Sequence, residues 1–483
     1  MSFIDKISIE ERSALRNVSN WEEYLEIAYE QFNESSEVNG QDGCFTIRNK
    51  IFEDTVILSR KFDCSIEFTN CYFLHSVVIE DLIVEKGFKI NQCFCDHSIF
   101  FNGKQTKIGG AFDIIDISVR QQFYIRDGEY GYCRLGFKNY TNVFIDGGTF
   151  KELVIGTWTG SKINSLNLKL NAVSGLITIT NPKTQINTLG ILHNSADVSL
   201  VLEDFSINHI GINKFRNIKS FKILNIIPFN TEDSPSLFEI ADSYLGKAEF
   251  YSVDFSSFEE VRILDTHLAE CSFVNVKWPE IIDPFVNKYS NQKEGEKRLR
   301  NKLAAVAFTR KVTEKWKLEI DNDILEYHSN RREIFRQLKQ AYSKQGDLIN
   351  EQKFHELELL AYNKSLTWRR YFFTKLIINL SNYFGRFGQD VRSPLVGLLL
   401  GHLLFFGVLL LGGALSPLHF TIANSNSEGF WLAFNKYFNL INPLRKSDDQ
   451  IFKGGWVLID LLIRIWASYM IYNIIRASRR FIK

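Results

Sequence analysis

Two long apolar segments in the last hundred residues constrain the fold of this chain more than any other feature. They cover residues 394–417 and 454–475, and residues 395–415 contain no Asp, Glu, Lys or Arg. A helix needs roughly 20 apolar residues to cross the hydrocarbon core of a bilayer. We therefore expect two transmembrane helices. The length of the first segment disfavours the alternatives, which are a signal anchor and a buried core helix.

Basic residues flank both segments and predict their orientation. They precede the first segment and follow the second: Arg369, Arg370, Lys375, Arg386, Arg392, Arg476, Arg479, Arg480 and Lys483. Lys and Arg concentrate on the cytoplasmic side of membranes. We therefore expect a multi-pass protein of the cell inner membrane with both termini in the cytoplasm. The first residues, which include acidic side chains and no apolar signal region, agree with this orientation.

A shorter aromatic segment, residues 429–444, lies between the two apolar segments and reads as a short helix followed by an extended turn. Helix, re-entrant half-helix and helix together resemble the two-helix pore module of potassium-channel-like proteins. The resemblance implies a homotetramer, and backbone that enters a bilayer must in any case be sheltered by protein or water. Because a Thr-Val-Gly-Tyr-Gly filter is absent, potassium selectivity is not supported. An interfacial aromatic helix without a pore is the alternative.

Four residues are candidates for lining such a pore. Asn439 and Asn442 stand where a filter would be, and Asp460 and Arg464 lie four residues apart on one face of the second apolar segment. A charged side chain deep inside a bilayer costs free energy, so such charges usually pair with each other or face water. Asp460 and Arg464 form either an intrahelical ion pair or a pore-facing or intersubunit pair, and both interpretations stay open.

Residues 41–283 show the patterns of many short strands and are predicted to form a cytosolic sensor domain. Apolar and polar residues alternate in several runs, turn signals such as Asn102-Gly103 separate them, and the strands recur about every twenty residues. Such a rung length predicts a right-handed β-solenoid, with a pair of β-sandwiches as the second choice. Residues 1–40 are predicted to form a helical cap, begun by a capping box of Ser19 and Glu22.

The last rungs of this region carry a sharper pattern, in which large apolar residues stand five positions apart. They form two series: Leu245, Phe250, Phe255; and Leu268, Phe273, Trp278. This spacing resembles pentapeptide-repeat proteins, in which the central residue of each repeat fills the interior of a square coil. The earlier rungs are longer and richer in β-branched residues, so the resemblance is degenerate and covers about half of the chain.

Residues 284–367 are expected to form a charged helical linker. Gly346 is a helix stop and Asp347 a cap for the next helix, which predicts an αα-hairpin. The stretch resembles the hairpin that joins a pentapeptide-repeat solenoid to a channel-like membrane domain, here residues 368–483. The basic run that opens it includes the candidate ligand-binding residues Arg298, Arg300 and Lys302. They could contact anionic lipid headgroups or a nucleotide phosphate, or form a solvated helix face.

The sequence offers little evidence for catalysis or metal binding. Cys93, Cys95 and His97 share one face of a strand, but no fourth ligand is apparent, and inward-facing filler is the preferred interpretation. Seven cysteines without a disulfide pattern predict reduced thiols. Nucleophile-elbow, Walker A and zinc-protease motifs are absent. We expect no enzyme, no cofactor and no metal, and the net charge of +1 gives no global argument for a nucleic-acid binder.

The complete layout resembles membrane channel effectors of bacterial anti-phage defence, of the Hailong type. The resemblance implies an ion channel gated through its solenoid by a small nucleotide or oligonucleotide, or by a partner protein encoded nearby. Opening would depolarise the membrane and disable the infected host. The alternative is a non-conducting, membrane-anchored scaffold whose solenoid binds a protein partner.

Overall fold

The computed structural model describes most of the chain. The described residues are 16–39, 43–156, 160–170, 173–194, 198–216, 219–230, 234–284, 314–412, 431, 435, 438–445 and 454–478. The chain divides into two compact units, Met1–Glu351 and Gln352–Lys483, here named the solenoid unit and the helical unit. The candidate ligand-binding residues Arg298, Arg300 and Lys302 lie outside the described residues.

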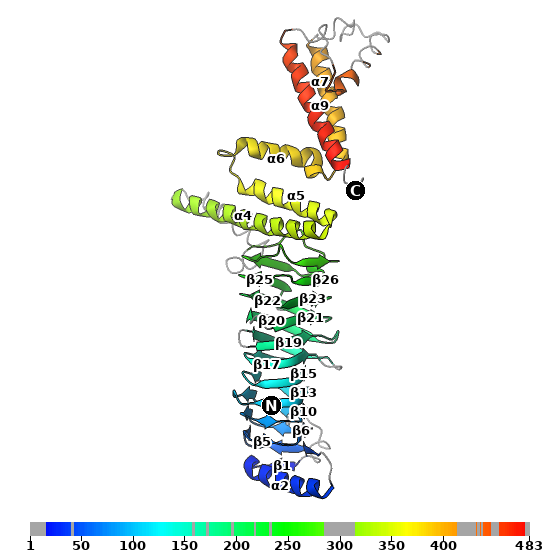
Figure 1. Ribbon diagram of the computed structural model, residues 1–483. Helices are drawn as coiled ribbons and strands as arrows, with labels where there is room; N and C mark the ends of the chain where they lie inside the picture. Colours follow the sequence, from blue (N-terminus) through cyan, green and yellow to red (C-terminus); the bar gives the residue numbers. More distant parts are fainter. Residues whose placement is uncertain are drawn as a thin grey trace. The chain divides into compact units, whose positions relative to one another are not determined.

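The solenoid unit is a stack of short parallel strands, as predicted (Figure 1). One ladder contains β2 (Cys44–Arg48), β6 (Ser65–Thr69), β10 (Gly87–Asn91), β13 (Lys107–Val119), β15 (Glu129–Phe137), β17 (Gly148–Ile155), β19 (Val173–Ile179), β21 (Val198–Glu203), β23 (Ser220–Leu224), β26 (Glu249–Tyr251) and β28 (Ser272–Val274). The short strands β1 (Arg16–Val18), β3 (Lys50–Phe52), β5 (Lys61–Phe62), β7 (Tyr72–Phe73), β9 (Ile83–Val84) and β11 (Phe94–Cys95) complete this sheet.

A second ladder forms the other main wall of the stack. It contains β4 (Val56–Leu58), β8 (Val77–Glu80), β12 (Ile99–Asn102), β14 (Gln122–Ile125), β16 (Thr141–Ile145), β18 (Lys162–Leu170), β20 (Gln185–Asn194), β22 (Ser206–Asn213), β25 (Leu237–Ala241) and β27 (Glu260–Leu264). The two-residue strand β24 (Ile227–Pro228) pairs with β22 off this path, and a 3-10 turn, η2, covers Phe255–Ser257. Each strand pairs with strands one rung away, so every rung is supported by its neighbours.

Columns of buried apolar side chains hold the rungs together. One column follows the register of the first ladder through Ile47, Phe68, Ile90, Ile114, Leu135, Ile155, Ile179, Leu202, Ile223, Phe250 and Phe273. All of these side chains are buried. Complete burial of such a side chain stabilises the fold by roughly 1.5–3 kcal/mol. The two predicted series with five-residue spacing are confirmed as core positions, since all six residues are buried.

A short polar residue with positive φ turns the chain at one corner of many rungs. It follows the inward residue of the column by two positions, as in Asn49 (φ 55°), Asn70 (φ 51°) and Asn225 (φ 45°). Asn and Asp tolerate this left-handed conformation better than other residues with a side chain. Neighbouring corners also bond to each other, because the amide of Asn70 donates to Asn49 over 2.7 Å. The corner therefore sets the register of each rung.

Helix α2 (Trp21–Asn39) covers the first rungs, which agrees with the predicted N-terminal cap (Figure 1). Trp21 packs edge-on against Phe52 at 5.3 Å between ring centroids, and its indole N–H donates to the carbonyl of Ile57 over 2.8 Å. The predicted capping box is displaced by one residue. Asn20, rather than Ser19, accepts the backbone N–H of Glu23, because the helix begins at Trp21.

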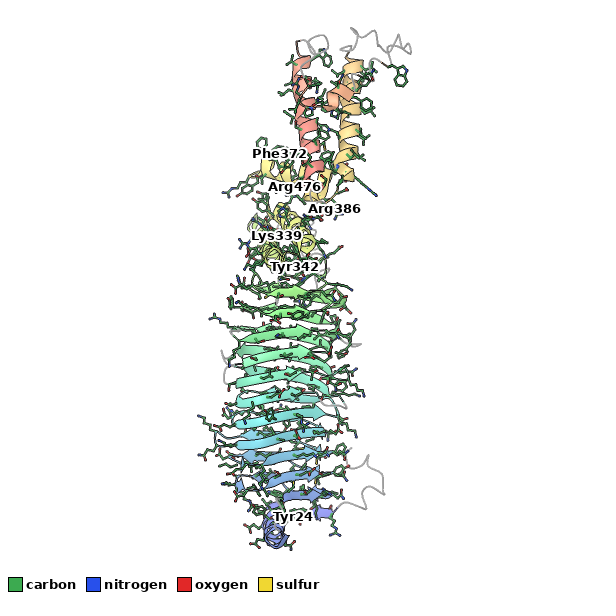
Figure 2. The ribbon with its side chains drawn as sticks, turned by 45° about the vertical axis from the view of Figure 1, so that its right-hand side comes forward. Tyr24, Lys339, Tyr342, Phe372, Arg386 and Arg476 are labelled. Carbon is green, nitrogen blue, oxygen red and sulfur yellow. The ribbon has the colours of Figure 1, made fainter. Side chains whose placement is uncertain are left out.

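Helix α4 (Glu314–Gln345) covers the last rungs of the same unit. Tyr342 is buried against Phe273 and accepts a hydrogen bond of 3.0 Å from the indole N–H of Trp278 (Figure 2). Gln345 accepts the backbone N–H of Phe273 over 3.1 Å and donates to the carbonyl of Cys271 over 3.0 Å. Polar side chains of α4 therefore satisfy backbone groups that another rung would otherwise bond.

The predicted break after this helix is confirmed. Helix α4 ends at Gln345, Gly346 has a φ of +76°, and the carboxylate of Asp347 accepts the backbone N–H of Asn350 at the start of α5 (Leu348–Ser365). The glycine is required because this φ strains residues with a side chain.

The helical unit contains α6 (Phe372–Gly385), the 3-10 turn η3 (Arg386–Gly388), α7 (Arg392–Leu411) and α9 (Trp456–Ser478). Helices α7 and α9 have mean hydropathies of 2.3 and 1.5 and are long and apolar enough to cross a membrane. Less than a third of each is buried, so most of their apolar surface faces outward. They start two residues from the predicted segments, and residues 413–417 lie outside the described residues.

The turn η3 between α6 and α7 contains three successive residues with positive φ, Arg386, Phe387 and Gly388. Side-chain contacts hold this conformation. Arg386 forms an ion pair of 3.1 Å with the buried Glu356 of α5, and Phe387 is buried beside Ile378. The backbone of the turn is therefore fixed by α5 and α6 within the helical unit.

Candidate functional site

Helices α7 and α9 approach closely through glycines that face aromatic rings. A Cβ added at Gly401 would lie 2.1 Å from the indole nitrogen of Trp466, and one at Gly412 would lie 2.1 Å from the ring of Trp456. A Cβ at Gly407 would meet nothing within 4 Å. Close packing of the two helices therefore depends on Gly401 and Gly412, whose contacts lie within one chain.

His402 connects α7 to the segment that lies between the two apolar helices. Its side chain is fully buried, with Nδ1 3.0 Å from the carbonyl oxygen of Leu398 and Nε2 2.9 Å from that of Leu440. A neutral imidazole has one N–H and donates to only one of these carbonyls, whereas an imidazolium donates to both. The imidazolium, or the neutral tautomer with its proton on Nε2, therefore binds a backbone group 38 residues away.

Apolar packing holds the same segment between both helices. Leu440 is buried with Leu409 of α7 and Ile463 of α9. The neighbouring Ile441 packs against Leu398 and Met470. Leu398, Ile463 and Met470 lie in the interior of their helices, while Leu409 lies in the last turn of α7. Residues 440 and 441 therefore occupy a position between the helices.

A buried charge cluster lies beside this segment. The carboxylate of Asp460 contacts the guanidinium of Arg445 on one side and accepts a hydrogen bond of 2.9 Å from Nε of Arg464 on the other. Asp460 and Arg445 are almost completely buried, and Arg464 is partly exposed. Nη1 of Arg445 also donates to the carbonyl of Leu440 over 3.1 Å, which connects the cluster to the contact of His402.

Among the residues that the structure describes, the cluster brings two guanidinium groups to one carboxylate. Burying charges is expensive unless each one is paired and hydrogen-bonded. The carboxylate of Asp460 meets this condition because it binds both Arg445 and Arg464. This arrangement fixes the segment between the helices through one carbonyl and one carboxylate.

The structure separates the four predicted pore-lining residues into two groups. Asp460 and Arg464 form an intrahelical ion pair of 2.9 Å, which agrees with their spacing of four residues. Asn439 and Asn442 are exposed. Asn442 contacts the charge cluster through its backbone carbonyl, which accepts Nη1 of Arg445 over 3.4 Å, and its amide oxygen accepts the backbone N–H of Leu444 over 2.9 Å. Of residues 429–444, the structure describes Trp431, Asn435 and residues 438–444.

Two residues of the site were not identified from the sequence. His402 is the one ionisable side chain in residues 395–415, a signal that a count of Asp, Glu, Lys and Arg overlooks. Arg445 appeared as one of several loop charges, and nothing in its neighbourhood distinguished it. Their partners Leu440 and Asp460 are distant in sequence, so a single sequence cannot pair them.

The cysteines and the histidine weighed as metal ligands belong to the solenoid core and its surface. Cys93 and Cys95 are buried, and the thiol of Cys93 lies 3.2 Å from the carbonyl of Asn91. His97 stacks edge-on with His75 at 5.4 Å. The described part of the chain contains no group of three or more His, Cys, Asp or Glu residues arranged to hold a metal ion.

Comparisons with known proteins do not assign the chain to a class. No protein-family model, curated protein or solved structure matches it. The function must therefore be argued from the geometry of the chain itself.

Proposed function

We propose that the helical unit crosses a membrane and forms an ion-conducting pore, and that the solenoid unit controls it. The observation that carries the proposal is the contact between His402 and the carbonyl of Leu440. His402 lies ten residues into α7, or about 15 Å along a helix of about 30 Å. The hydrocarbon core of a bilayer is also about 30 Å thick. If α7 spans the core, the backbone at Leu440 reaches its middle and then returns, as a re-entrant segment does.

A re-entrant segment supports a pore because exposed backbone is not tolerated in lipid. Such backbone must be sheltered by protein or must face water. Asn439 and Asn442 are exposed beside Leu440 and would otherwise lie in hydrocarbon. Additional copies of the chain would shelter them around a central axis. We infer a homotetramer from the resemblance of helix, re-entrant segment and helix to potassium-channel-like modules.

The charge cluster indicates how the re-entrant segment is held. Asp460, Arg445 and Leu440 fix the re-entrant segment to α9. The sequence lacks a potassium filter, so the proposal assigns no particular ion to the pore.

The biological role is also proposed on resemblance. A capped solenoid offers a long surface for a nucleotide, an oligonucleotide or a partner protein encoded nearby, as in Hailong-type anti-phage effectors and other pentapeptide-repeat channel-like proteins. Binding there would open the pore, depolarise the inner membrane and stop phage production. The turn η3, fixed by Glu356 and Arg386, is the element of the helical unit best placed to move α7 when α5 moves.

Planar-bilayer recording of the purified full chain tests the proposal. We expect Asn442→Asp to shift the reversal potential toward cations, because it adds a negative charge beside the re-entrant segment. The same substitution at Asn382 on α6 is the control and should leave the reversal potential unchanged. Absence of conductance with every candidate ligand, in a monomer or dimer, would support a membrane-anchored scaffold instead.

A further inference from the structure

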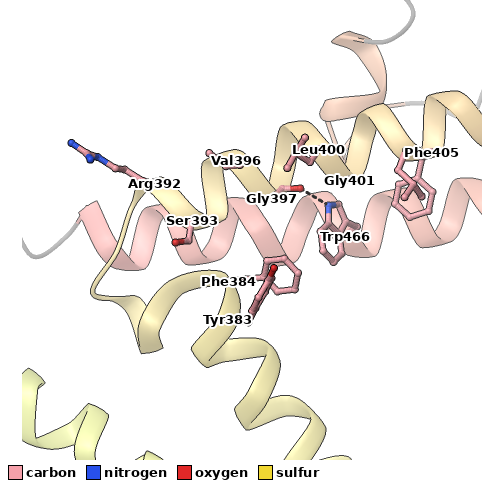
Figure 3. A pocket seen from close by; sticks show the side chains of 11 residues that line it. Tyr383, Phe384, Arg392, Ser393, Val396, Gly397, Leu400, Gly401, Phe405 and Trp466 are labelled. Carbon is pink, nitrogen blue, oxygen red and sulfur yellow. Dashed lines mark hydrogen bonds between the residues drawn. The ribbon is translucent and has the colours of Figure 1, made fainter.

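An open groove of about 740 Å³ runs along the outer surface of α7, where α6 and α9 pack against it (Figure 3). Leu400 and Leu404 of α7 form much of its wall, and each is more than half exposed. Phe384 of α6 and Trp466 of α9 form its base, with ring centroids 4.9 Å apart. The indole N–H of Trp466 donates to the carbonyl of Gly397 over 3.3 Å, so the base of the groove offers no free donor.

The groove has the length of one leaflet of a bilayer. Its lining on α7 extends from Arg392 to Phe405. Thirteen helical steps cover about 20 Å, while half of the hydrocarbon core measures about 15 Å. The helix of a second copy would instead pack closely against small residues of α7. The space beside Gly401 is moreover filled by Trp466 of the same chain, so it is closed to a second helix.

The end of the groove at which α7 begins is polar, and it carries the carboxylate of Asp390 and the guanidinium of Arg392. The backbone N–H of Arg392 donates to Asp390 over 2.8 Å, and the hydroxyl of Ser393 donates to the same carboxylate. Asp390 is therefore engaged in capping α7. The guanidinium of Arg392 is exposed and projects outward (Figure 3), and it forms no ion pair with any residue that the structure describes.

We propose that this groove binds one anionic phospholipid, with an acyl chain along Leu400 and Leu404 and the phosphate at Arg392. An apolar channel of one-leaflet length that ends at an exposed arginine matches that ligand in shape and charge. The site rests on α7 and α9 crossing the membrane, as the proposed function requires, but it does not depend on conduction.

Native mass spectrometry of the full chain in detergent tests the site with added phosphatidylglycerol or phosphatidylcholine. We expect Leu400→Trp to fill the groove and remove one retained phosphatidylglycerol per chain. Leu403→Trp is the matched control, because Leu403 is a similarly exposed leucine of α7 outside the groove. Arg392→Gln should reduce the preference for phosphatidylglycerol over phosphatidylcholine about tenfold, since a charge-assisted hydrogen bond is lost. Arg370→Gln should retain that preference.

Three results would overturn the proposal. Equal lipid loss in Leu400→Trp and Leu403→Trp would indicate a general lipid annulus. A change of oligomeric mass in Leu400→Trp, with retained lipid unchanged, would indicate that a second copy occupies the groove. An unchanged lipid preference in Arg392→Gln would remove the role of the arginine. Since the measurement needs no voltage, its failure is separate from failure of the proposed channel.

An optical measurement checks contact with the acyl chain independently. Phosphatidylglycerol brominated on its acyl chains quenches tryptophans that it touches. We expect Trp466→Phe to lose the part of the fluorescence that the brominated lipid quenches. In Arg392→Gln, brominated phosphatidylglycerol at low concentration should no longer quench Trp466. An identical quenched fraction in the wild type and Trp466→Phe would contradict the proposed position of the lipid.

Discussion

The missing side chain at Gly401 determines how closely α7 and α9 pack. An alanine there would place its Cβ 2.1 Å from Trp466, so the ring or a helix must move. Overpacking of this kind costs about 1–3 kcal/mol. We expect Gly401→Ala to lower the midpoint of thermal unfolding of the detergent-solubilised protein. Gly407→Ala is the control, and it should be neutral or slightly stabilising because alanine favours helix by up to about 1 kcal/mol. Equal midpoints for the two variants would contradict this packing.

Asp460 contacts two arginines, so substituting Asp460 should destabilise the fold more than substituting either arginine. Asp460→Asn leaves Arg445 buried without its carboxylate, and breaking a buried pair in this way costs about 3–5 kcal/mol. Arg464→Gln should cost less, because Arg464 is partly exposed and Asp460 keeps Arg445. Chemical unfolding of both variants in detergent measures the difference. A larger effect of Arg464→Gln would show that Arg445 is not the main partner of Asp460.

Part of this site could be predicted from the sequence, and part could not. The pair of Asp460 and Arg464 follows from a spacing of four on one helix, which is local information. The contacts of His402 with Leu440 and of Arg445 with Asp460 join elements that are separate in the chain. Such contacts depend on how helices pack, and a single sequence without homologues does not encode them in any local pattern.

At the scale of elements, the solenoid was predictable but most of its register was not. The five-residue spacing identified the core of the last rungs, whereas earlier rungs differ in length because their corner loops differ. The corners carry a further sequence signal, since Asn49, Asn70 and Asn225 each follow an inward apolar residue by two positions. A search for a polar residue that tolerates positive φ at this offset would have aligned these rungs.

Helix α4 protects the last rung, and Tyr342 is the centre of that contact. We expect Tyr342→Ala to cost about 3–5 kcal/mol locally, because a large buried side chain is removed. Hydrogen exchange should then accelerate at the amides of Leu268 and Phe273, which α4 covers through Gln337 and Gln345. Amides of β10, far along the stack, are the internal control. Tyr342→Phe should cost only about 1 kcal/mol, since it removes a single hydrogen-bond acceptor. Equal exchange in both variants would rule out this capping role.

At the scale of the whole molecule, buried thiols connect the stability of the solenoid to pH. Burial raises the pKa of Cys95 and of Cys271 to about 12, from an ordinary value of 9.0 in the unfolded chain. The neutral thiols stabilise the folded state fully below pH 9, and this contribution is lost as the pH rises toward 12. Between those values each thiol should reduce the free energy of unfolding by about 1.4 kcal/mol per pH unit. Denaturant titrations at pH 8 and pH 10 measure this change.

Thiol labelling gives a second readout of the same feature. Cys44 is exposed, while Cys95, Cys271 and the other cysteines are buried. At pH 8 an alkylating reagent should modify Cys44 alone in the folded protein, and all seven cysteines after unfolding. Modification of Cys271 in the native protein at the rate of Cys44 would show that the end of the stack is open.

Each rung of the solenoid unit pairs only with its neighbours, so the number of rungs determines the length of the unit. Consecutive parallel strands are about 4.8 Å apart, so one whole rung changes the length of the stack by that step. Helices α2 and α4 contact only the terminal rungs, and an internal rung could therefore be deleted or duplicated without altering either cap. Such a change would leave both ends of the unit intact while altering the distance between them. The length of the solenoid unit can thus be changed, by evolution or by design, in steps of a single rung.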